Sequence, residues 1–280
     1  MRKKSIAGLF LSIALGVTLA GCESNKGAET PDSGGKEVFK VGMEAAYAPF
    51  NWTQMDDSNG GVKIQENEEF AGGYDVEIAK KIADGLDKDL VIVKTEWDGL
   101  IPSLDTGVVD AIIAGMSPTA ERSESIDFTV PYYKSELVMV VKKGSQYENA
   151  TSIQDFKGAK ITAQQGTFHP TVIDQIEGVK KETEMADFSA MRVALESGII
   201  DGYVSERPEG ISAEEANSNF VMVEFEDGFE ASDEDVAVAV GIKKGQDDLV
   251  EKINKILSDL SEEDRQKLMD QAIKNQPASN

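Results

Sequence analysis

Strand-like apolar segments and amphipathic helical segments alternate along this chain of 280 residues. In its first half, the predicted strands are 38–43, 90–94 and 108–115, and the predicted helices are 75–86 and 98–106. Parallel strands need a crossover between them, so alternation of this kind is typical of a parallel α/β sheet. Asp75 stands at the start of the first helix, where we expect its side chain to cap the free backbone N–H groups.

A second unit of the same kind follows. Its predicted strands are 136–142, 160–163, 199–204 and 235–242, and its predicted helices are 188–196, 249–260 and 262–273. Two consecutive units predict two lobes, which we place at 38–134 plus 240–280 and at 135–239. Ligands of open α/β sheets lie beyond the carboxyl ends of the strands, so a ligand cleft is expected between the lobes.

The N-terminus predicts export. A short basic segment precedes fifteen uncharged residues at 7–21, which is too short for a membrane-spanning helix and typical of a secretory signal. The segment ends in Leu19-Ala20-Gly21-Cys22, which resembles the lipobox of bacterial lipoproteins. We therefore predict a signal peptide at 1–21, a lipidated Cys22, a flexible tether at 22–37, and a location at the outer face of the cytoplasmic membrane. The alternative is an ordinary signal peptide with a chance cysteine.

The charge balance and the residue content exclude several classes of function. The formal net charge is −23, which makes binding to nucleic acid or to anionic lipid surfaces unfavourable. The chain has one cysteine and one histidine, so no Cys/His metal spacing exists and neither a metal nor a cofactor is expected. The segment 224–235 is acidic and is expected to be a solvated loop. We expect a monomer.

Polar groups follow the predicted strands at the edge where a ligand would lie. Glu44 and Tyr47 follow the first strand, Arg122 follows the third, and Glu206 follows the strand at 199–204. A ligand carboxylate needs a guanidinium together with N–H donors, and a ligand ammonium needs a carboxylate. This set of residues therefore predicts a site for a zwitterion.

Five segments, in order, resemble the family 3 extracellular solute-binding proteins, which bind amino acids for ABC importers. They are YAPF at 47–50, GGYDVEIAKKIADGL at 72–86, WDGLIPSLDTGVVDAIIAGMSPTAER at 97–122, IDFTVPYY at 126–133 and ALESGIIDGYV at 194–204. The resemblance covers about 38–273. It implies a two-lobed periplasmic-binding-protein-like fold of type II, with two crossing hinge strands near 132–137 and 236–240. It also implies binding by lobe closure, an ABC permease as partner, and no enzymatic activity.

The resemblance also implies roles for single residues. Arg122 matches the arginine that binds the ligand's α-carboxylate, and Glu206 matches the acid, usually Asp, that binds its α-ammonium. Glu is one methylene longer than Asp, so the ammonium contact is expected to be displaced or indirect. The other implied ligand-binding positions are Gly115, Ser117 and Thr167 around the ligand backbone, Tyr47 and Trp97 beside its side chain, Glu44 near the far end, and Gln164 and Phe168 close by.

Several alternatives stay open at this stage. Arg122 could instead pair with Glu121 or Glu124 in solvent, and His169 is expected to be a solvated loop residue. Glu44 and Glu206 make the cleft acidic, which favours lysine, arginine or histidine, although Gln164 could equally serve glutamine or another polar amino acid. The other function classes are a dehydratase-like enzyme on the same fold and a ligand-sensing domain. Sensing domains are normally joined to a transmembrane helix and a signalling module.

Overall fold

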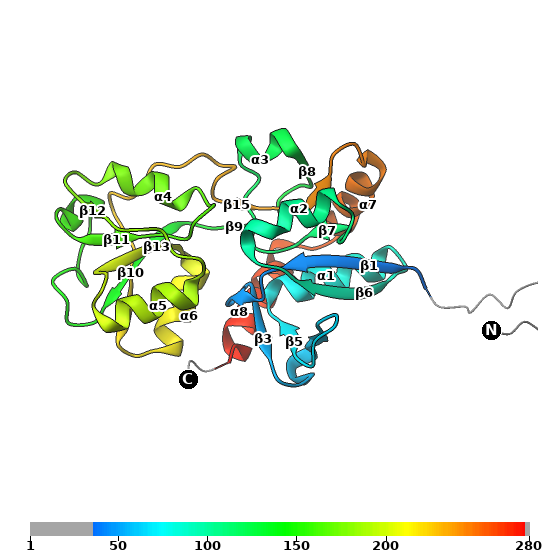
Figure 1. The fold of residues 1–280 in the computed structure, drawn as a ribbon, viewed down its shortest axis with the longest axis horizontal. Helices are drawn as coiled ribbons and strands as arrows, with labels where there is room; N and C mark the ends of the chain where they lie inside the picture. Colours follow the sequence, from blue (N-terminus) through cyan, green and yellow to red (C-terminus); the bar gives the residue numbers. More distant parts are fainter. Residues whose placement is uncertain (1–35, 278–280) are drawn as a thin grey trace, which may run out of the picture. The chain divides into compact units, whose positions relative to one another are not determined.

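The computed structural model describes residues 36–277. The predicted signal peptide, Cys22 and most of the predicted tether lie outside the described residues. Among the residues described, no helix is both long enough and apolar enough to cross a membrane. Two five-stranded sheets, one in each lobe, form the framework of this part of the chain (Figure 1).

The sheet of lobe 1 has the order β6-β1-β7-β16-β8. Strand β1 is parallel to both of its neighbours, β6 and β7, and β16 runs antiparallel to β7 and β8. The bounds of the strands are β1 Val38–Met43, β6 Asp89–Lys94, β7 Ala111–Ile112, β8 Ile126–Phe128 and β16 Gly241–Lys243. The helices of this lobe are α1 Tyr74–Gly85, α2 Leu100–Asp105, α3 Ala120–Ser125, α7 Asp247–Ser258 and α8 Glu262–Asn275, with the short 3-10 helix η2 at Trp97–Gly99.

The sheet of lobe 2 has the order β12-β11-β13-β10-β14. Strand β11 is parallel to β12 and β13, whereas β10 is antiparallel to β13 and β14. The strands are β10 Leu137–Lys142, β11 Lys160–Thr162, β12 Lys180–Lys181, β13 Gly202–Glu206 and β14 Phe220–Val223. The helices are α4 His169–Val172, α5 Phe188–Ser197 and α6 Arg207–Ala216, with the 3-10 helices η3 Ile153–Phe156 and η4 Ile173–Gln175.

Two crossing strands join the lobes. Strand β9 (Tyr133–Lys134) pairs antiparallel with β15 (Ala237–Val238) in a separate two-stranded ladder between the two large sheets (Figure 1). Both strands lie within the ranges predicted for the hinge. The two-lobed α/β fold with two crossing strands is therefore confirmed.

A four-stranded sheet, β2-β3-β5-β4, lies beside lobe 1. Its strands are β2 Ala46–Tyr47, β3 Asn51–Gln54, β4 Val62–Lys63 and β5 Phe70–Gly72, and the 3-10 helix η1 spans Ser58–Gly60. The sheet places Tyr47 at the edge of the ligand cleft. Its strands are two to four residues long.

Helix α1 confirms the predicted buried face, but its start differs from the prediction. Val76, Ala79 and Ile82 are fully buried, as their spacing predicts. The capping role of Asp75 is wrong, because Gly73 occupies the N-cap position and Asp75 lies inside the helix. The Asp75 carboxylate is buried and accepts hydrogen bonds from Asn51 Nδ2 at 2.8 Å and from the Tyr132 hydroxyl at 2.7 Å. It is therefore a buried anchor rather than a cap.

Helix α6 follows β13 directly and was not predicted, because Pro208 and Gly210 interrupt the helical pattern. Pro208 stands in the first turn, where its missing N–H has no helical partner to lose. Gly210 lies where an added Cβ would come within 2.6 Å of the Met222 side chain. The two residues that interrupt the pattern therefore allow the helix to begin at Arg207, directly after β13, and to pack closely against β14.

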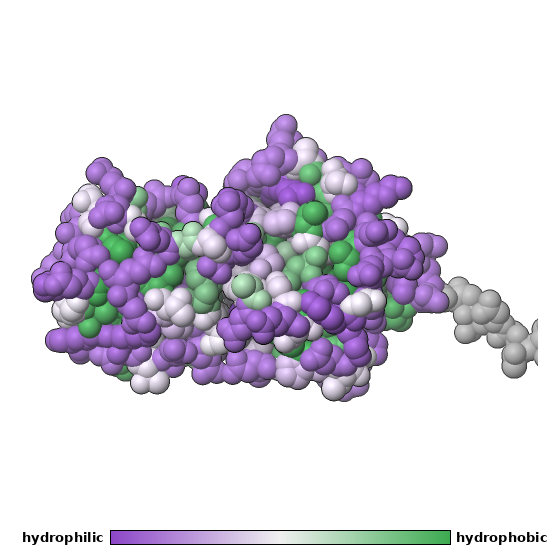
Figure 2. All heavy atoms as spheres, turned by 90° about the horizontal axis from the view of Figure 1, so that it is seen from above, coloured by the Kyte–Doolittle hydropathy of each residue, from purple (hydrophilic) through white to green (hydrophobic). Residues whose placement is uncertain are grey.

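The outer surface is mostly hydrophilic. Figure 2 shows one face on which hydrophilic residues predominate and apolar residues appear in scattered spots. This agrees with the net charge of −23.

Candidate functional site: a small cavity between the lobes

A small cavity lies between the lobes and is lined by side chains from both. Its lining residues are Tyr47, Trp97, Gly115, Ser117, Arg122, Gln164, Thr167, Phe168, His169, Phe188 and Glu206. Its volume is about 10 Å³, which is room for about one water molecule. An amino acid is far larger, so it can enter only if the lobes separate or the lining side chains move.

Arg122 contacts both lobes. Its Nη1 donates to the carbonyl oxygen of Ser117 at 3.0 Å, and its Nη2 donates to the carbonyl oxygen of Gly166 at 2.9 Å. The guanidinium carbon also lies 5.1 Å from the ring centroid of Trp97, a cation–π arrangement. Arg122 is thus held in the cavity wall rather than paired with Glu121 or Glu124 in solvent.

The guanidinium of Arg122 has N–H groups that remain free to bind a ligand. Two of its five N–H groups are used by the two carbonyl contacts. Burial lowers its pKa to about 10, so the group remains a cation at neutral pH. Thr119 fixes the start of α3 by accepting a hydrogen bond from the Arg122 backbone N–H at 3.3 Å.

Two glycines allow the backbone to approach this site. Gly115 has φ of +63°, and an added Cβ there would lie 2.6 Å from the Tyr47 ring. Gly166 has φ of +67°, and an added Cβ there would lie 2.7 Å from Asp98 Oδ1. Both conformations favour glycine, and both positions lack space for a side chain. The turns after β7 and after β11 therefore need glycine at these positions.

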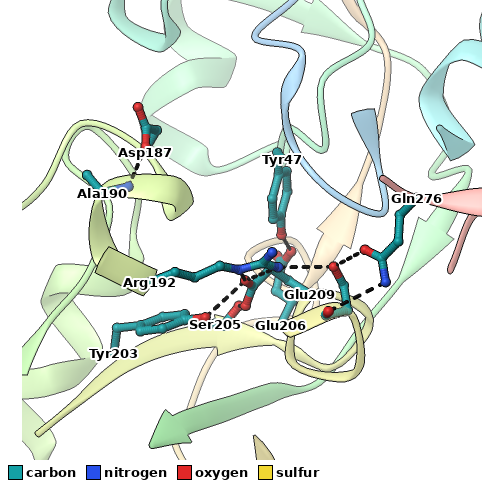
Figure 3. A network of polar contacts seen from close by, with 10 residues as sticks. Tyr47, Asp187, Ala190, Arg192, Tyr203, Ser205, Glu206, Glu209 and Gln276 are labelled. Carbon is teal, nitrogen blue, oxygen red and sulfur yellow. Dashed lines mark hydrogen bonds and ion pairs between the residues drawn. The ribbon is translucent and has the colours of Figure 1, made fainter. Parts of the chain in front are cut away.

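Glu206 is connected to lobe 1 by Tyr47. Its side chain is 2% exposed, and Oε2 accepts a short hydrogen bond from the Tyr47 hydroxyl. Tyr47 in turn stacks on Phe50, with ring centroids 4.9 Å apart, and on Phe188, with centroids 4.5 Å apart. The acid at the end of β13 is thus held by an aromatic group at the end of β2 (Figure 3).

Glu44 lies next to the cavity lining and does not form part of it. Its carboxylate is 5% exposed and accepts hydrogen bonds from Gln164 Nε2 at 3.2 and 3.3 Å. The pKa of Glu44 is raised to about 7, mainly by burial; the hydrogen bond from Gln164 lowers it, and the negative charges of Asp187, Glu96 and Asp98 add smaller increases within that value. This end of the site is therefore an acidic region that a positive charge would stabilise.

The turn after β11 supplies the lobe 2 wall. The Thr167 hydroxyl donates to the Gln164 carbonyl at 2.8 Å and accepts from the His169 backbone N–H at 3.3 Å. Trp97 Nε1 donates to the Gly166 carbonyl at 3.1 Å, so this carbonyl also accepts a bond from lobe 1. These bonds fix the turn that carries Thr167 and Phe168.

Two cavity residues were not predicted to bind ligand. Phe188 is the first residue of α5, and the sequence marks it only as a helix position. His169 was expected to be solvated, and this is wrong. Its side chain lines the cavity and the residue is 4% exposed, because α4 packs against β13.

A buried ionic network supports the end of β13 (Figure 3). The fully buried Glu209 accepts hydrogen bonds from Arg192 Nε at 3.0 Å and from Arg192 Nη2 at 2.8 Å. It also accepts bonds from the hydroxyls of Tyr203 and Ser205. Two residues of β13 are thereby tied to α5 and α6, immediately before Glu206.

The network extends to the C-terminal segment. Arg192 Nη2 donates to the Ser212 hydroxyl at 3.0 Å, and that hydroxyl donates to Gln276 Oε1. Gln276 Nε2 lies 3.4 Å from the Ser212 carbonyl oxygen. Gln276 directly follows α8, a helix that contacts both α1 of lobe 1 and α6 of lobe 2. The C-terminal helix therefore connects the two lobes.

The site therefore offers an anchored guanidinium, a buried carboxylate on the opposite lobe, and an acidic region beyond them. Among residues 36–277, no group of three or more His, Cys, Asp or Glu side chains could hold a metal ion. This is the chemistry of a binding site for a small charged molecule.

Comparison with known proteins agrees with this geometry. A family model described as bacterial extracellular solute-binding proteins, family 3, matches residues 39–274. The chain belongs to this family. The resemblance inferred from the sequence is thereby confirmed. This solute-binding protein is accordingly a binding protein rather than an enzyme, and it belongs to a family of extracellular proteins.

Among curated relatives of this solute-binding protein, a probable histidine-binding protein of Campylobacter jejuni is 31% identical over 185 residues, which are 64% of this chain and 65% of that protein. The arginine-binding protein 1 of an Escherichia coli ABC transporter is 30% identical over 181 residues, which are 64% of this chain and 61% of that protein. The matches thus span somewhat less than two thirds of these relatives' length.

A solved structure extends the likeness over most of the fold. An amino acid ABC transporter substrate-binding protein of Streptococcus pneumoniae, bound to L-arginine, superposes with a TM-score of 0.74 at 28% sequence identity. The superposition covers 85% of this chain and 94% of the other. The two-lobed architecture of this solute-binding protein is therefore shared with that protein.

Proposed function

We propose that this protein is the substrate-binding component of an ABC importer for amino acids. It captures one polar or basic amino acid, as a zwitterion, between its lobes. The observation that carries the proposal is the pairing of opposite charges across one cavity: the Arg122 guanidinium on lobe 1 and the buried Glu206 carboxylate on lobe 2. The names of the relatives, which are histidine- and arginine-binding proteins, support the same ligand class.

The ligand's α-carboxylate binds Arg122. The free N–H groups of the guanidinium bind a carboxylate in a bidentate manner, which a lysine could not reproduce. Gly115, Ser117 and Thr167 lie in the same cavity and contribute backbone and hydroxyl groups. The ligand's α-ammonium binds on the Glu206 side of the cavity.

The ligand side chain extends past Tyr47 and Trp97 towards Glu44. The charges of Glu96, Asp98 and Asp187 act on Glu44, so this end of the site favours a second positive charge. Arginine, lysine and histidine are therefore preferred over neutral amino acids. A glutamine-like ligand would use Gln164 and would leave the Glu44 carboxyl without a cationic partner.

Capture works by closure of the lobes about β9 and β15. Arg122 and Trp97 already contact the Gly166 carbonyl across the cleft, so the closed form has contacts of its own. A ligand that binds groups of both lobes adds to these contacts and shifts the population towards closure. The permease then distinguishes the closed form from the open form.

The protein is anchored by lipid at Cys22, and the segment 22–37 tethers the lobes to the outer face of the membrane. The lipobox-like sequence Leu19-Ala20-Gly21-Cys22 supports this proposal. The test is to label cells with a fatty-acid analogue and fractionate them. Wild-type protein is expected to carry the label in the membrane fraction, and Cys22→Ala is expected to lose it. A labelled Cys22→Ala protein would contradict the anchor.

The test of the ligand class is a calorimetric titration of the purified protein against the twenty amino acids, after unfolding and refolding to remove carried-over ligand. Tight binding of arginine, lysine or histidine is expected. Tight binding of a neutral polar amino acid would keep the transport function and overturn the preference for a basic ligand. No binding by any amino acid would overturn the proposal.

A further inference from the structure

His169 is a buried polar residue whose ring has no hydrogen-bond partner in the described part of the protein. Its residue is 4% exposed, and neither Nδ1 nor Nε2 has a hydrogen-bond partner. Buried side-chain nitrogens are nearly always paired, because an unpaired one loses its hydration without compensation. The ring also lines the cavity between the lobes. Its nitrogens are therefore available to a ligand there.

Glu206 is the group that His169 faces. His169 Nε2 lies 3.7 Å from Glu206 Oε1, which is beyond hydrogen-bond range. The other carboxylate oxygen, Oε2, accepts the bond from Tyr47. Two buried atoms therefore face the cavity side by side: Oε1, which is not used by Tyr47, and Nε2 of the imidazole.

We propose that His169 is a ligand-binding residue that shares the α-ammonium of the bound amino acid with Glu206. The inference rests on the proposed function. An ammonium nitrogen at about 2.9 Å from both atoms is geometrically possible, because two acceptors 3.7 Å apart lie well within twice that distance. The ammonium has three N–H donors, and the neutral imidazole has one acceptor nitrogen. Nε2 of His169 and Oε1 of Glu206 would thus each accept one hydrogen bond from the ammonium.

The contact with Tyr47 gives a reason for the second acceptor. Tyr47 donates to one oxygen of the Glu206 carboxylate, so Oε1 is the oxygen that keeps both of its lone pairs for a ligand. A single carboxylate oxygen leaves two ammonium donors to be satisfied in a cavity that has room for about one water molecule. His169 supplies one of the missing acceptors from the start of α4, on the same lobe as Glu206. His169 and Glu206 therefore form the ammonium site together, and they move as one when the lobes close because both belong to lobe 2.

The test compares two ligands that differ only in the α-amino group: L-arginine and 5-guanidinopentanoic acid, which keeps the carboxylate and the guanidinium. In His169→Leu, the affinity for L-arginine is expected to fall about ten- to hundredfold, the loss of one hydrogen bond to a charged group. The affinity of His169→Leu for 5-guanidinopentanoic acid is expected to stay within about twofold of wild type, because this ligand has no ammonium group that could bind His169. If another amino acid is the one bound, the pair is that amino acid and its deamino analogue.

Two further variants complete the experiment. His169→Gln retains a side-chain acceptor and is expected to bind L-arginine more tightly than His169→Leu does. His169→Met fills similar space with an apolar chain and replaces His169→Leu if that variant does not fold. An equal loss for both ligands would mean that His169 acts only by packing, and unchanged L-arginine affinity would mean that it is not a ligand contact. Either result overturns the inference. A wild-type protein that binds no amino acid overturns the proposed function instead.

Discussion

The guanidinium of Arg122 in lobe 1 donates a 2.9 Å hydrogen bond to the carbonyl oxygen of Gly166 in lobe 2. The residue expected to bind the ligand's carboxylate therefore also joins the lobes. Trp97 donates to the same carbonyl oxygen at 3.1 Å. We therefore expect ligand binding and lobe closure to be coupled at this point, because both would depend on the placement of one side chain.

Replacing Arg122 tests the carboxylate site. Arg122→Ala is expected to weaken L-arginine binding about a hundredfold or more, because a carboxylate would be left without its cation in a buried site. Arg122→Lys keeps the charge and loses the bidentate geometry, so an intermediate loss is expected. Agmatine lacks the carboxylate, and calorimetry should find its affinity nearly unchanged in both variants. Near-normal L-arginine binding by Arg122→Ala would contradict the assignment.

Gly115 and Gly107 form a matched pair for a backbone test. Both have positive φ, but an added Cβ would lie 2.6 Å from Tyr47 at Gly115 and would meet nothing within 4 Å at Gly107. Gly107→Ala should cost only about 1–2 kcal/mol of stability from the left-handed backbone. Gly115→Ala adds a steric clash of about 1–3 kcal/mol and is expected to displace Tyr47 and to reduce ligand affinity. Denaturant unfolding and calorimetry measure the two effects, and equal stability losses would show that the crowding at Gly115 is relieved at no cost.

The sequence predicts the elements better than it predicts their contacts. The pattern locates α1, α5, α7 and α8 because each buries one apolar face, and periodicity records that face. The predicted strand at 108–115 is reduced to a two-residue ladder, β7, because the chain bends at 108 and 110 before this ladder and at 114–115 after it. Apolar runs of this kind show burial and do not show how much of the run pairs with a neighbour.

The same distinction applies to the site. Nine of the ten predicted ligand-binding residues line one cavity, and Glu44 lies behind Gln164. Strand ends are visible in the sequence, so polar residues placed there are found by position. His169 and Phe188 stand at helix starts and reach the cavity only because of how α4 and α5 pack. No local sequence pattern predicts that packing.

The pKa of Glu44 makes ligand affinity depend on pH. Burial raises this pKa to about 7, so the carboxylate becomes largely ionised only as the pH rises through about 7. A cationic ligand side chain binds the ionised form, and its affinity should therefore increase between about pH 6 and pH 8 and be accompanied by proton release. Glu44→Gln should flatten this dependence. Calorimetry in buffers of different ionisation enthalpy measures both effects, and a pH-independent wild-type affinity would contradict the role of Glu44.

The raised pKa of Glu44 also predicts that the ligand-free protein becomes less stable as the pH rises, whereas its affinity for a cationic ligand increases. A raised pKa in the folded state means that protonated Glu44 stabilises the fold below the usual carboxyl pKa of about 4.5 and that this stabilisation is lost as the pH rises through about 7. Asp75 acts in the same direction, since burial raises its pKa to about 6. As the pH rises from 5 to 8, the unfolding free energy of the wild type should therefore fall relative to that of Glu44→Gln. Denaturant unfolding at each pH measures this difference.

Two arginine–glutamate pairs allow a controlled test of the buried network. Arg192 pairs with the fully buried Glu209, whereas Arg207 pairs with Glu224 where both side chains are about half exposed. Arg192→Met leaves a buried carboxylate uncompensated and is expected to cost about 3–5 kcal/mol of stability. Arg207→Met removes an exposed pair and should cost about 0–1 kcal/mol. Similar losses in denaturant unfolding would show that Glu209 finds other partners when Arg192 is removed.

The central claim is that an amino acid is bound by closure of the lobes on both ends of a zwitterion. Small-angle X-ray scattering of the ligand-stripped protein, with and without saturating L-arginine or the amino acid that calorimetry identifies, tests it most directly. The account predicts a smaller radius of gyration with ligand in the wild-type protein and no change in Arg122→Ala at the same ligand concentration. An unchanged radius in the wild type, with calorimetry showing a saturated site, would contradict it.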